Sequence, residues 1–465
     1  IGIQSAGGIG YVLAEWIRDG QPPTDLWEVD VRRNIPFQSN RKYLQERVSE
    51  SLGLLYAMHW PFLQPETGRG ARRSPVYDRL VARGACHGVS SGWERPNWFA
   101  PKGMKPVYEY SYGRQNWFDA SAEEHRVVRE EVGLFDQCSF SKFRLQGRDA
   151  ASVIGQVAAN DMDVPVGRVV YTQWLNDAGG IEADLTVTRV AEDDYLIVTS
   201  GEFQVRDFHW LTRHIPEGAH AALTDVTSGM SMLGLMGPRA RDLLQLLSPD
   251  DLSNDGFPFG ASRNIELGYS YVRASRISYV GELGWELYMP TEFTTGIYDL
   301  LIEAGVEYGL RPVGMHAMNS LRIEKAYRHY GHDITDADTP LEGGLGFAVK
   351  FDKTGGFIGR DALLRQKEAG LRKRLVQFLL NNPEPMLYHN EPIWRDGTLA
   401  GYTRSAMYGH TVGGAVALGY VENPDGVDAD YVKSGVYEIE IAGVRYPATA
   451  SLHPLYDPKS ERIKA

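Results

Sequence analysis

Apolar positions recur along this chain with the two spacings that belong to helices and to strands. Between residues 117 and 327 the two spacings alternate, and the same order of elements occurs twice. The first pass runs from a strand at 139–145 to a helix at 203–214, and the second from a strand at 231–236 to a helix at 312–327. Two similar passes predict the internal duplication of an α+β unit.

After residue 346 the pattern changes to short strands. The spacing predicts strands at 375–380, 392–394, 398–403, 415–421, 436–440 and 444–451. Strands this short and this regularly spaced are typical of a small barrel or a sandwich.

The N-terminal hundred residues are less regular. A Ser/Gly cluster with Gly7, Gly8 and Gly10 opens a helix, and Gly20 ends it. The free N–H groups at such a helix start suit an electron-rich ligand edge. The residues alone favour a plainer reading, in which the glycines let the helix start pack closely on a strand, because no G-x-G-x-x-G fingerprint is present.

Two short helices are expected next, at about 41–56 and 76–83. They are followed by an aromatic segment with Trp93, Trp98 and Phe99. We expect these three side chains to pack between domains rather than to bind a ligand.

Length, charge and hydropathy exclude several classes of protein. A chain of 465 residues exceeds one hydrophobic core, so several domains are expected. The formal charge of −12 argues against a nucleic-acid partner, which needs a basic face. No apolar run approaches the roughly 20 residues of a membrane helix, and no leader peptide is recognisable, so no membrane partner is expected. Because the chain begins with Ile1 inside a glycine-rich element, we expect it to be part of a longer protein.

Cysteine and histidine limit the redox and metal chemistry. With only Cys86 and Cys138, the chain fits a reducing compartment such as the cytoplasm or, in a eukaryote, the mitochondrial matrix. Two cysteines are too few for a disulfide framework or a thiolate metal site. His316, His329 and His332 lie near one another in sequence, but no third-ligand pattern accompanies them, so no metal site is expected.

One candidate site lies between residues 158 and 186. Asp161 follows an apolar helical run, Tyr171 lies in the β-rich segment after it, and a glycine turn at 179–180 returns the chain. An acid held at an element end beside an aromatic strand can orient a flat, nitrogen-rich ligand. The alternative is that Asp161 only bonds a backbone turn, as Asn-Asp pairs usually do.

A second constellation, S-Y-V-G-E-L-G-W-E-L-Y, spans residues 278–288. It puts Tyr279 at a strand end and Glu286 early on the next strand. A carboxylate can accept two parallel N–H bonds from an amino-substituted heterocycle, and a Tyr adds a stacking face or a hydroxyl. Because Glu286 lies among apolar residues it needs a partner, which is either an internal Arg or a ligand.

Charges also gather on one predicted helix, at Arg322, Glu324 and Lys325. Their spacing favours a solvated or interdomain network over catalysis.

Several motifs, taken in order, resemble the glycine cleavage T-protein (aminomethyltransferase) family over roughly residues 115 to 460. The first are G-L-F-D near 133, N-D at 160, Y-T and N-x-x-G-G at 171–180, and Y-x-G-E-x-G-W-E at 279–286. They are followed by S-L-R-I-E-K at 320, T-P-L-E-G-G-L at 339 and F-I-G-R-x-A-L at 357.

The front of the chain, with S-A-G-G-I-G and G-W-E-R-P-N-W-F, resembles the dimethylglycine and sarcosine dehydrogenases. In that family a flavin-dependent half precedes the folate half. The resemblance implies an α+β fold, with two related ferredoxin-like subdomains and a C-terminal β-barrel, preceded by a remnant of a flavin oxidoreductase domain. The implied parts are the end of the flavin domain (1–34), a flavin central or linker domain (35–105), the folate-binding domain (106–345) and the barrel domain (346–465).

The resemblance also implies an activity. A flavin half, mainly absent from this chain and therefore an expected partner, would use FAD to oxidise an N-methylated amino acid such as dimethylglycine or sarcosine. The iminium product would pass to tetrahydrofolate and give 5,10-methylenetetrahydrofolate.

By matching motifs, Asp161 would assist the folate nitrogens as a base or electrostatic anchor. The implied contacts are, for folate, Tyr171, Tyr279, Glu286, Phe140 and Ser200, and, for the flavin, Gly7, Gly8 and Gly10. Phe140 and Ser200 stand where T-proteins usually have Met and often Asn. Met318 replaces an Arg that helps to bind folate in that family, which leaves the contact to the glutamate tail of folate unassigned.

Two alternatives remain from the sequence. The first is a stand-alone tetrahydrofolate-dependent aminomethyltransferase, which would have no use for residues 1–100. The second is a folate-binding protein without transferase activity, like the iron–sulfur assembly relatives. Those carry a Cys motif where this chain has E-K-A-Y-R-H-Y-G-H-D-I.

Overall fold

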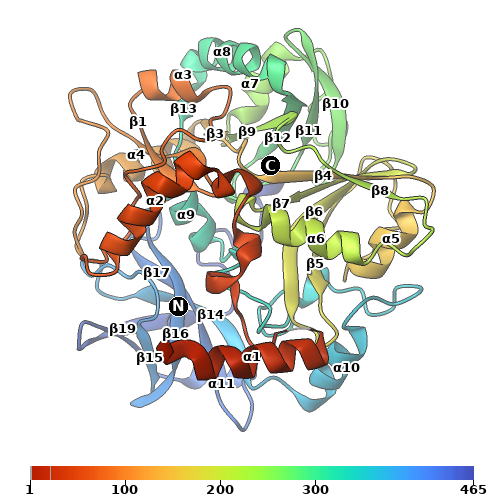
Figure 1. Cartoon of the computed structure of the whole chain (residues 1–465). Coiled ribbons are helices and arrows are strands. Elements are labelled where there is room, and N and C mark those ends of the chain that lie inside the picture. The colour runs from red at the N-terminus through yellow and green to blue at the C-terminus, as the bar shows by residue number, and fades with distance from the viewer. Residues whose placement is uncertain (1–2, 21) are drawn as a thin grey trace.

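The computed structural model describes residues 3–20 and 22–465. Two sheets and a barrel form three lobes around the helix α9 (Met315–Glu324) (Figure 1). Ile323 packs with residues of the first sheet and the barrel, and Met318 and Leu321 pack with residues of the second sheet. Helix α9 therefore contributes to the cores of all three lobes.

The first sheet is antiparallel, with the strand order β5-β6-β7-β4-β8. Its elements in chain order are β4 (Ser141–Gln146), α5 (Ala150–Val157), β5 (Val169–Leu175), β6 (Ile181–Ala191), β7 (Asp194–Thr199), α6 (Gln204–Arg213) and β8 (Ala222–Asp225).

The second sheet repeats this arrangement. Its order β10-β11-β12-β9 repeats β5-β6-β7-β4 of the first sheet, and β13 follows α8 in the chain as β8 follows α6. The strand β3 lies between β9 and the short parallel strand β13. The elements are β3 (Gly133–Asp136), β9 (Met230–Met236), α7 (Ala240–Leu247), β10 (Ser262–Leu267), β11 (Ser270–Ser275), β12 (Gly284–Pro290), α8 (Thr294–Ala304) and β13 (Arg311–Pro312). The predicted duplication is confirmed.

The C-terminal lobe is a closed barrel rather than a sandwich, with the strand order β14-β17-β16-β15-β18-β19. The strands are β14 (Lys373–Leu380), β15 (Pro392–Arg395), β16 (Thr398–Gly409), β17 (Gly414–Glu422), β18 (Tyr437–Ile441) and β19 (Val444–Ser451). Pairing of β14 with β19, for example Gln377 opposite Ser451, closes the barrel. The helices α10 (Arg360–Ala369) and α11 (Ala429–Ser434) flank it.

A hairpin of β1 (Ala85–Ser90) and β2 (Trp93–Phe99) lies between α3 (Tyr77–Ala82) and α4 (Phe118–Glu130) in the chain. The sequence pattern did not predict its strands. Trp98 is fully buried in a cluster that also contains Ile323 of α9 and Tyr420 of the barrel, and Phe99 packs against the core of the second sheet. The expected packing between lobes is thus observed for Trp98 and Phe99, whereas the ring of Trp93 packs under the guanidinium of Arg72.

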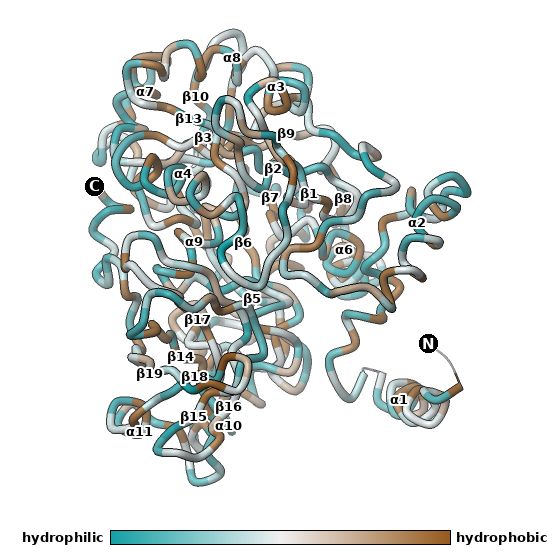
Figure 2. The backbone as a smooth tube through the Cα atoms, turned by 90° about the vertical axis from the view of Figure 1, so that its left-hand side faces the viewer, coloured by the Kyte–Doolittle hydropathy of each residue, from teal (hydrophilic) through white to brown (hydrophobic). Residues whose placement is uncertain are grey.

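Helix α1 (Ala6–Asp19) stands apart from the three lobes (Figure 2). It ends at Gly20, whose φ of 74° is the left-handed conformation expected of a glycine cap. None of its residues is buried, and nothing lies within 4 Å of the space beside Gly7, Gly8 or Gly10. The close packing of a glycine-rich helix start on a strand is therefore not observed. Helix α2 (Arg41–Leu54) follows.

No helix in the described part of the chain combines the length and the apolar composition that crossing a membrane requires.

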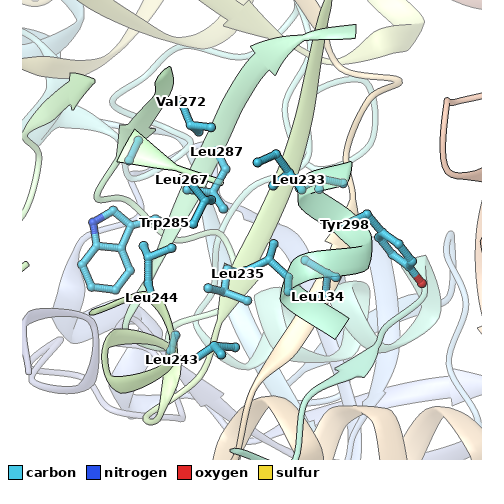
Figure 3. Packing of buried hydrophobic residues seen from close by; sticks show 14 of the residues in the cluster. Leu134, Leu233, Leu235, Leu243, Leu244, Leu267, Val272, Trp285, Leu287 and Tyr298 are labelled. Carbon is cyan, nitrogen blue, oxygen red and sulfur yellow. The ribbon is translucent and has the colours of Figure 1, made fainter. Parts of the chain in front are cut away.

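The core of the second sheet gives a direct test of this packing. Figure 3 shows Leu243 and Leu244 of α7 packed against Leu235, Trp285 and Leu287. Leu243→Ala should destabilise the protein by about 2–5 kcal/mol, because it leaves a cavity. Leu246, on the same helix, is 63% exposed, so Leu246→Ala should change stability by less than about 0.5 kcal/mol. Urea unfolding followed by tryptophan fluorescence measures both, and equal shifts would contradict this packing.

Candidate functional site

Asp184 lies on the face of β6 opposite to the core of the first sheet. Ala183 and Leu185 are buried in that core, and the alternation along a strand turns Asp184 to the other side. Directly across on β5, Gln173 donates from Nε2 to Asp184 Oδ1 at 2.8 Å. Residues 171 and 173 share one face of β5, so the Tyr171 side chain lies on the same side as Gln173 and lowers the pKa of Asp184.

The environment of Asp184 raises its pKa toward neutrality. Burial raises the pKa of the carboxyl to about 6, although hydrogen bonds from Gln173 and Tyr171 and the charge of Arg328 act in the opposite direction. Burial, and next the Asp184 charge, hold the pKa of Tyr171 well above its usual range. A carboxyl that titrates near neutral pH can both accept and release a proton.

Tyr279 and Arg328 complete this polar group. The Tyr279 hydroxyl donates to the backbone oxygen of Arg328 at 2.8 Å, and its ring stacks on Tyr327 with centroids 6.0 Å apart. Burial raises the pKa of Tyr279, with a smaller contribution from the Asp184 charge. The Asp184 charge thus acts on both of the sequence-predicted tyrosines, Tyr171 and Tyr279.

Glu286 lies on β12 at the contact between the two sheets. It is buried, and it accepts a hydrogen bond from the Tyr288 hydroxyl rather than from an Arg. Burial raises the pKa of Glu286 to about 7, although Tyr288 and the Lys142 charge lower it. Phe140 packs against the same cluster as Tyr288. Across residues 3–20 and 22–465, no hydrogen bond or ion pair joins Glu286 to Tyr171 or Tyr279.

Asp161 occupies a turn after α5. Its Oδ1 accepts the backbone N–H of Asp163 at 3.0 Å, which is the turn interaction that the sequence left open as the alternative. Its charge acts on Lys353, whose Nζ donates to the backbone oxygen of Asn160 at 3.2 Å. Burial lowers the pKa of Lys353 to about 8.

The remaining predicted residues lie elsewhere. Ser200 caps a short 3-10 turn, and its side chain accepts from the backbone N–H of Glu202. Gly7, Gly8 and Gly10 lie on exposed positions of α1.

Asp184 is the functional candidate that sequence reasoning overlooked. The signal was present, because apolar residues at 181, 183, 185 and 187 alternate with polar ones and place Asp184 on the polar face. Its proximity to Tyr279, however, depends on contacts between distant segments. Met318, which replaces the family's Arg, is buried in an apolar cluster, and the charge of Arg328 lowers the pKa of Asp184.

Comparison with known families agrees with this architecture. Residues 76–353 match the GCVT N-terminal domain, residues 373–457 match the glycine cleavage T-protein C-terminal barrel domain, and residues 19–74 match the FAD dependent oxidoreductase central domain. The chain belongs to the glycine cleavage T-protein family. It carries in addition part of a flavin oxidoreductase domain, as the motifs predicted.

Individual relatives show which members of the family the chain resembles. The chain is similar to 4-methylaminobutanoate oxidase (formaldehyde-forming) of Paenarthrobacter nicotinovorans, with 45% identity over 463 residues, covering 100% of this chain and 55% of that protein. It is similar to mitochondrial sarcosine dehydrogenase of Homo sapiens, with 35% identity over 504 residues and coverage of 100% and 55%. The chain spans about half the length of these relatives.

A solved structure shares the fold. The glycine cleavage system aminomethyltransferase T from Bartonella henselae superposes with a TM-score of 0.71 at 23% identity, over 84% of this chain and 99% of that one. The predicted α+β fold with a C-terminal barrel is confirmed.

The raised pKa of Asp184 makes stability depend on pH. Its pKa is about 6 in the folded protein against the ordinary value of 3.8 for an Asp side chain, so the folded state binds more protons between these values and stability falls as pH rises through them. Asp184→Asn removes this penalty. Its stability advantage over the wild type should grow by about 1 kcal/mol from pH 5 to pH 8.

Urea unfolding at the two pH values measures this difference. Asp193→Asn is the matched control, because Asp193 is an exposed carboxylate in the β6–β7 turn. It should give the same difference from the wild type at both pH values. If the effect of Asp184→Asn on the free energy of unfolding did not change with pH, folding would not raise the pKa of this half-buried carboxyl.

Proposed function

We propose that this chain is the folate-dependent half of an N-methyl amine dehydrogenase or oxidase and transfers a one-carbon unit to tetrahydrofolate. The observation that carries the proposal is the group of Asp184, Tyr171, Tyr279 and Arg328 within a T-protein fold. The similarity to sarcosine dehydrogenase and to a formaldehyde-forming oxidase supports an N-methylated amino acid as the source of that unit.

The residues present fit a reduced pterin. Carboxylates accept N–H bonds from an amino-substituted ring, and the tyrosines offer hydroxyls and aromatic surface. Gln173 Oε1 is buried without a hydrogen-bond partner among the described residues, which leaves an acceptor free beside Asp184. When bound, tetrahydrofolate would supply the two nitrogens, N5 and N10, that hold the one-carbon unit in 5,10-methylenetetrahydrofolate.

Each residue then has a distinct task. Asp184 accepts the proton that a ring nitrogen loses, since its pKa near 6 leaves it ionised and available at neutral pH. Arg328 stabilises that charge, and Tyr171 and Gln173 fix the direction of the carboxylate. Glu286 also lines the site and binds the amino edge of the pterin. In this assignment Asp161 is the alternative acid, held in its turn by Asp163.

The flavin chemistry would belong mainly to residues outside this chain. FAD would supply the oxidation of the N-methyl group. The match of residues 19–74 to a flavin oxidoreductase domain, and the exposed glycines on α1, support contact with such a partner half. The same residues argue against a stand-alone aminomethyltransferase. A purely folate-binding protein would have no need of a carboxyl whose pKa is raised toward neutrality.

Folate binding tests the proposal first. Titration calorimetry of this chain with tetrahydrofolate should give saturable one-site binding, and Glu286→Gln should weaken it about ten- to hundredfold, as expected for loss of a charge-assisted bond. Glu266→Gln, an exposed change on β10, should have no effect. Because the pKa of Glu286 is about 7, wild-type affinity should also fall from pH 8 to pH 6, and Glu286→Gln should lack that fall. Absence of saturable binding would contradict the proposal.

The rate of one-carbon transfer distinguishes Asp184 from Asp161 as the proton acceptor. The chain should accelerate the formation of 5,10-methylenetetrahydrofolate from formaldehyde and tetrahydrofolate, measured by stopped-flow absorbance against buffer alone. Asp184→Asn should lose at least about tenfold of this acceleration while still binding tetrahydrofolate. Asp161→Asn should retain most of it. The reverse outcome would assign the proton transfer to Asp161.

A further inference from the structure

Three metal-ligating side chains meet outside the polar group around Asp184. Glu202 lies in the short turn after β7, and His329 and His332 lie in the segment after α9. One ligand atom of each lies within 4.8 Å of the other two. The sequence placed the two histidines together, but the third group comes from a distant segment. His316, the third nearby histidine in sequence, bonds the Tyr108 hydroxyl instead.

The hydrogen bonding leaves these ligand atoms available. Glu202 Oε1 accepts from the Ser90 hydroxyl at 2.7 Å, and Arg95 Nη2 lies 3.8 Å from the same oxygen. In the described ranges, 3–20 and 22–465, neither Glu202 Oε2 nor the ring nitrogens of the two histidines make a hydrogen bond. His329 is half-buried and His332 is exposed, so solvent reaches the cluster.

A simple ion pair explains the cluster less well. The two ring centroids lie only 4.5 Å apart, where two imidazolium ions would repel. Two imidazole rings facing one carboxylate are the arrangement that a cation completes.

We propose that Glu202, His329 and His332 bind one divalent transition-metal cation of the zinc class. Two imidazole nitrogens and one carboxylate oxygen are a common zinc ligand set, and the exposed side leaves a position for water. The Ser90 hydroxyl orients the carboxylate from the second coordination sphere. The cation ties the 329–332 segment to the turn after β7 and, through Ser90, to the β1–β2 hairpin.

Arg95 places a positive charge 3.8 Å from the Glu202 carboxylate. Its guanidinium repels a cation held by Glu202, so it weakens the affinity. Removal of the Arg95 charge should therefore tighten binding of the cation at this site. It should have no such effect on a cation bound by chance elsewhere on the surface.

Cobalt titration tests the proposal independently of activity. The chain, freed of any histidine tag, is titrated with Co²⁺ alone. We expect one equivalent to give the visible absorption of four- or five-coordinate cobalt, reversed by Zn²⁺. His332→Gln, an exposed substitution that spares the core, should weaken binding at least about tenfold. His453→Gln, an exposed histidine after β19, should leave it unchanged.

Two outcomes would overturn the site. One is the absence of a visible cobalt band in the wild type, and the other is equal cobalt affinity in His332→Gln and His453→Gln. Arg95→Gln should bind Co²⁺ several-fold more tightly than the wild type, because a like charge near the cation is removed. Weaker binding in Arg95→Gln would place the cation elsewhere.

Discussion

One carboxylate without access to water joins α9 to α4 and to the barrel. Glu324, at the end of α9, accepts from Arg129 Nη2 of α4 at 2.8 Å and from the backbone N–H of Thr411 in the barrel at 2.7 Å. Arg129 also donates to Glu282, which Arg462 of the C-terminal segment reaches at 2.9 Å. Because an unpaired buried charge would destabilise the fold by about 3–5 kcal/mol, α4, the barrel and the C-terminal segment are held in one arrangement.

The same helix holds the segment that carries Arg328. Arg322 pairs with Asp333 at 2.6 Å, and Asp333 also accepts the backbone N–H of His329 at 2.9 Å. A buried ion pair in the core therefore fixes the segment from which the charge of Arg328 acts on Asp184. The charges on α9 form an interdomain network rather than a solvated face.

Asp184 and Glu286 share a property that packing alone does not explain. Burial raises the pKa of both carboxyls toward neutrality, so at neutral pH each holds its charge at the expense of folding stability. Apolar residues at these strand positions would avoid that penalty. Such groups are typical of sites where ligand binding or proton transfer matters more than stability.

The sequence by itself determined most of the elements after residue 117 and their order, but not the β1–β2 hairpin. Periodicity predicted the duplicated α+β unit and the barrel strands, because local spacing decides which residues face a core. It also selected Tyr171 and Tyr279. Only the tertiary structure decided which acid stands beside them, that Glu286 bonds Tyr288 at the contact between the sheets, and that Glu202 meets two histidines. Those distances depend on pairing between remote segments, which a one-dimensional pattern does not contain.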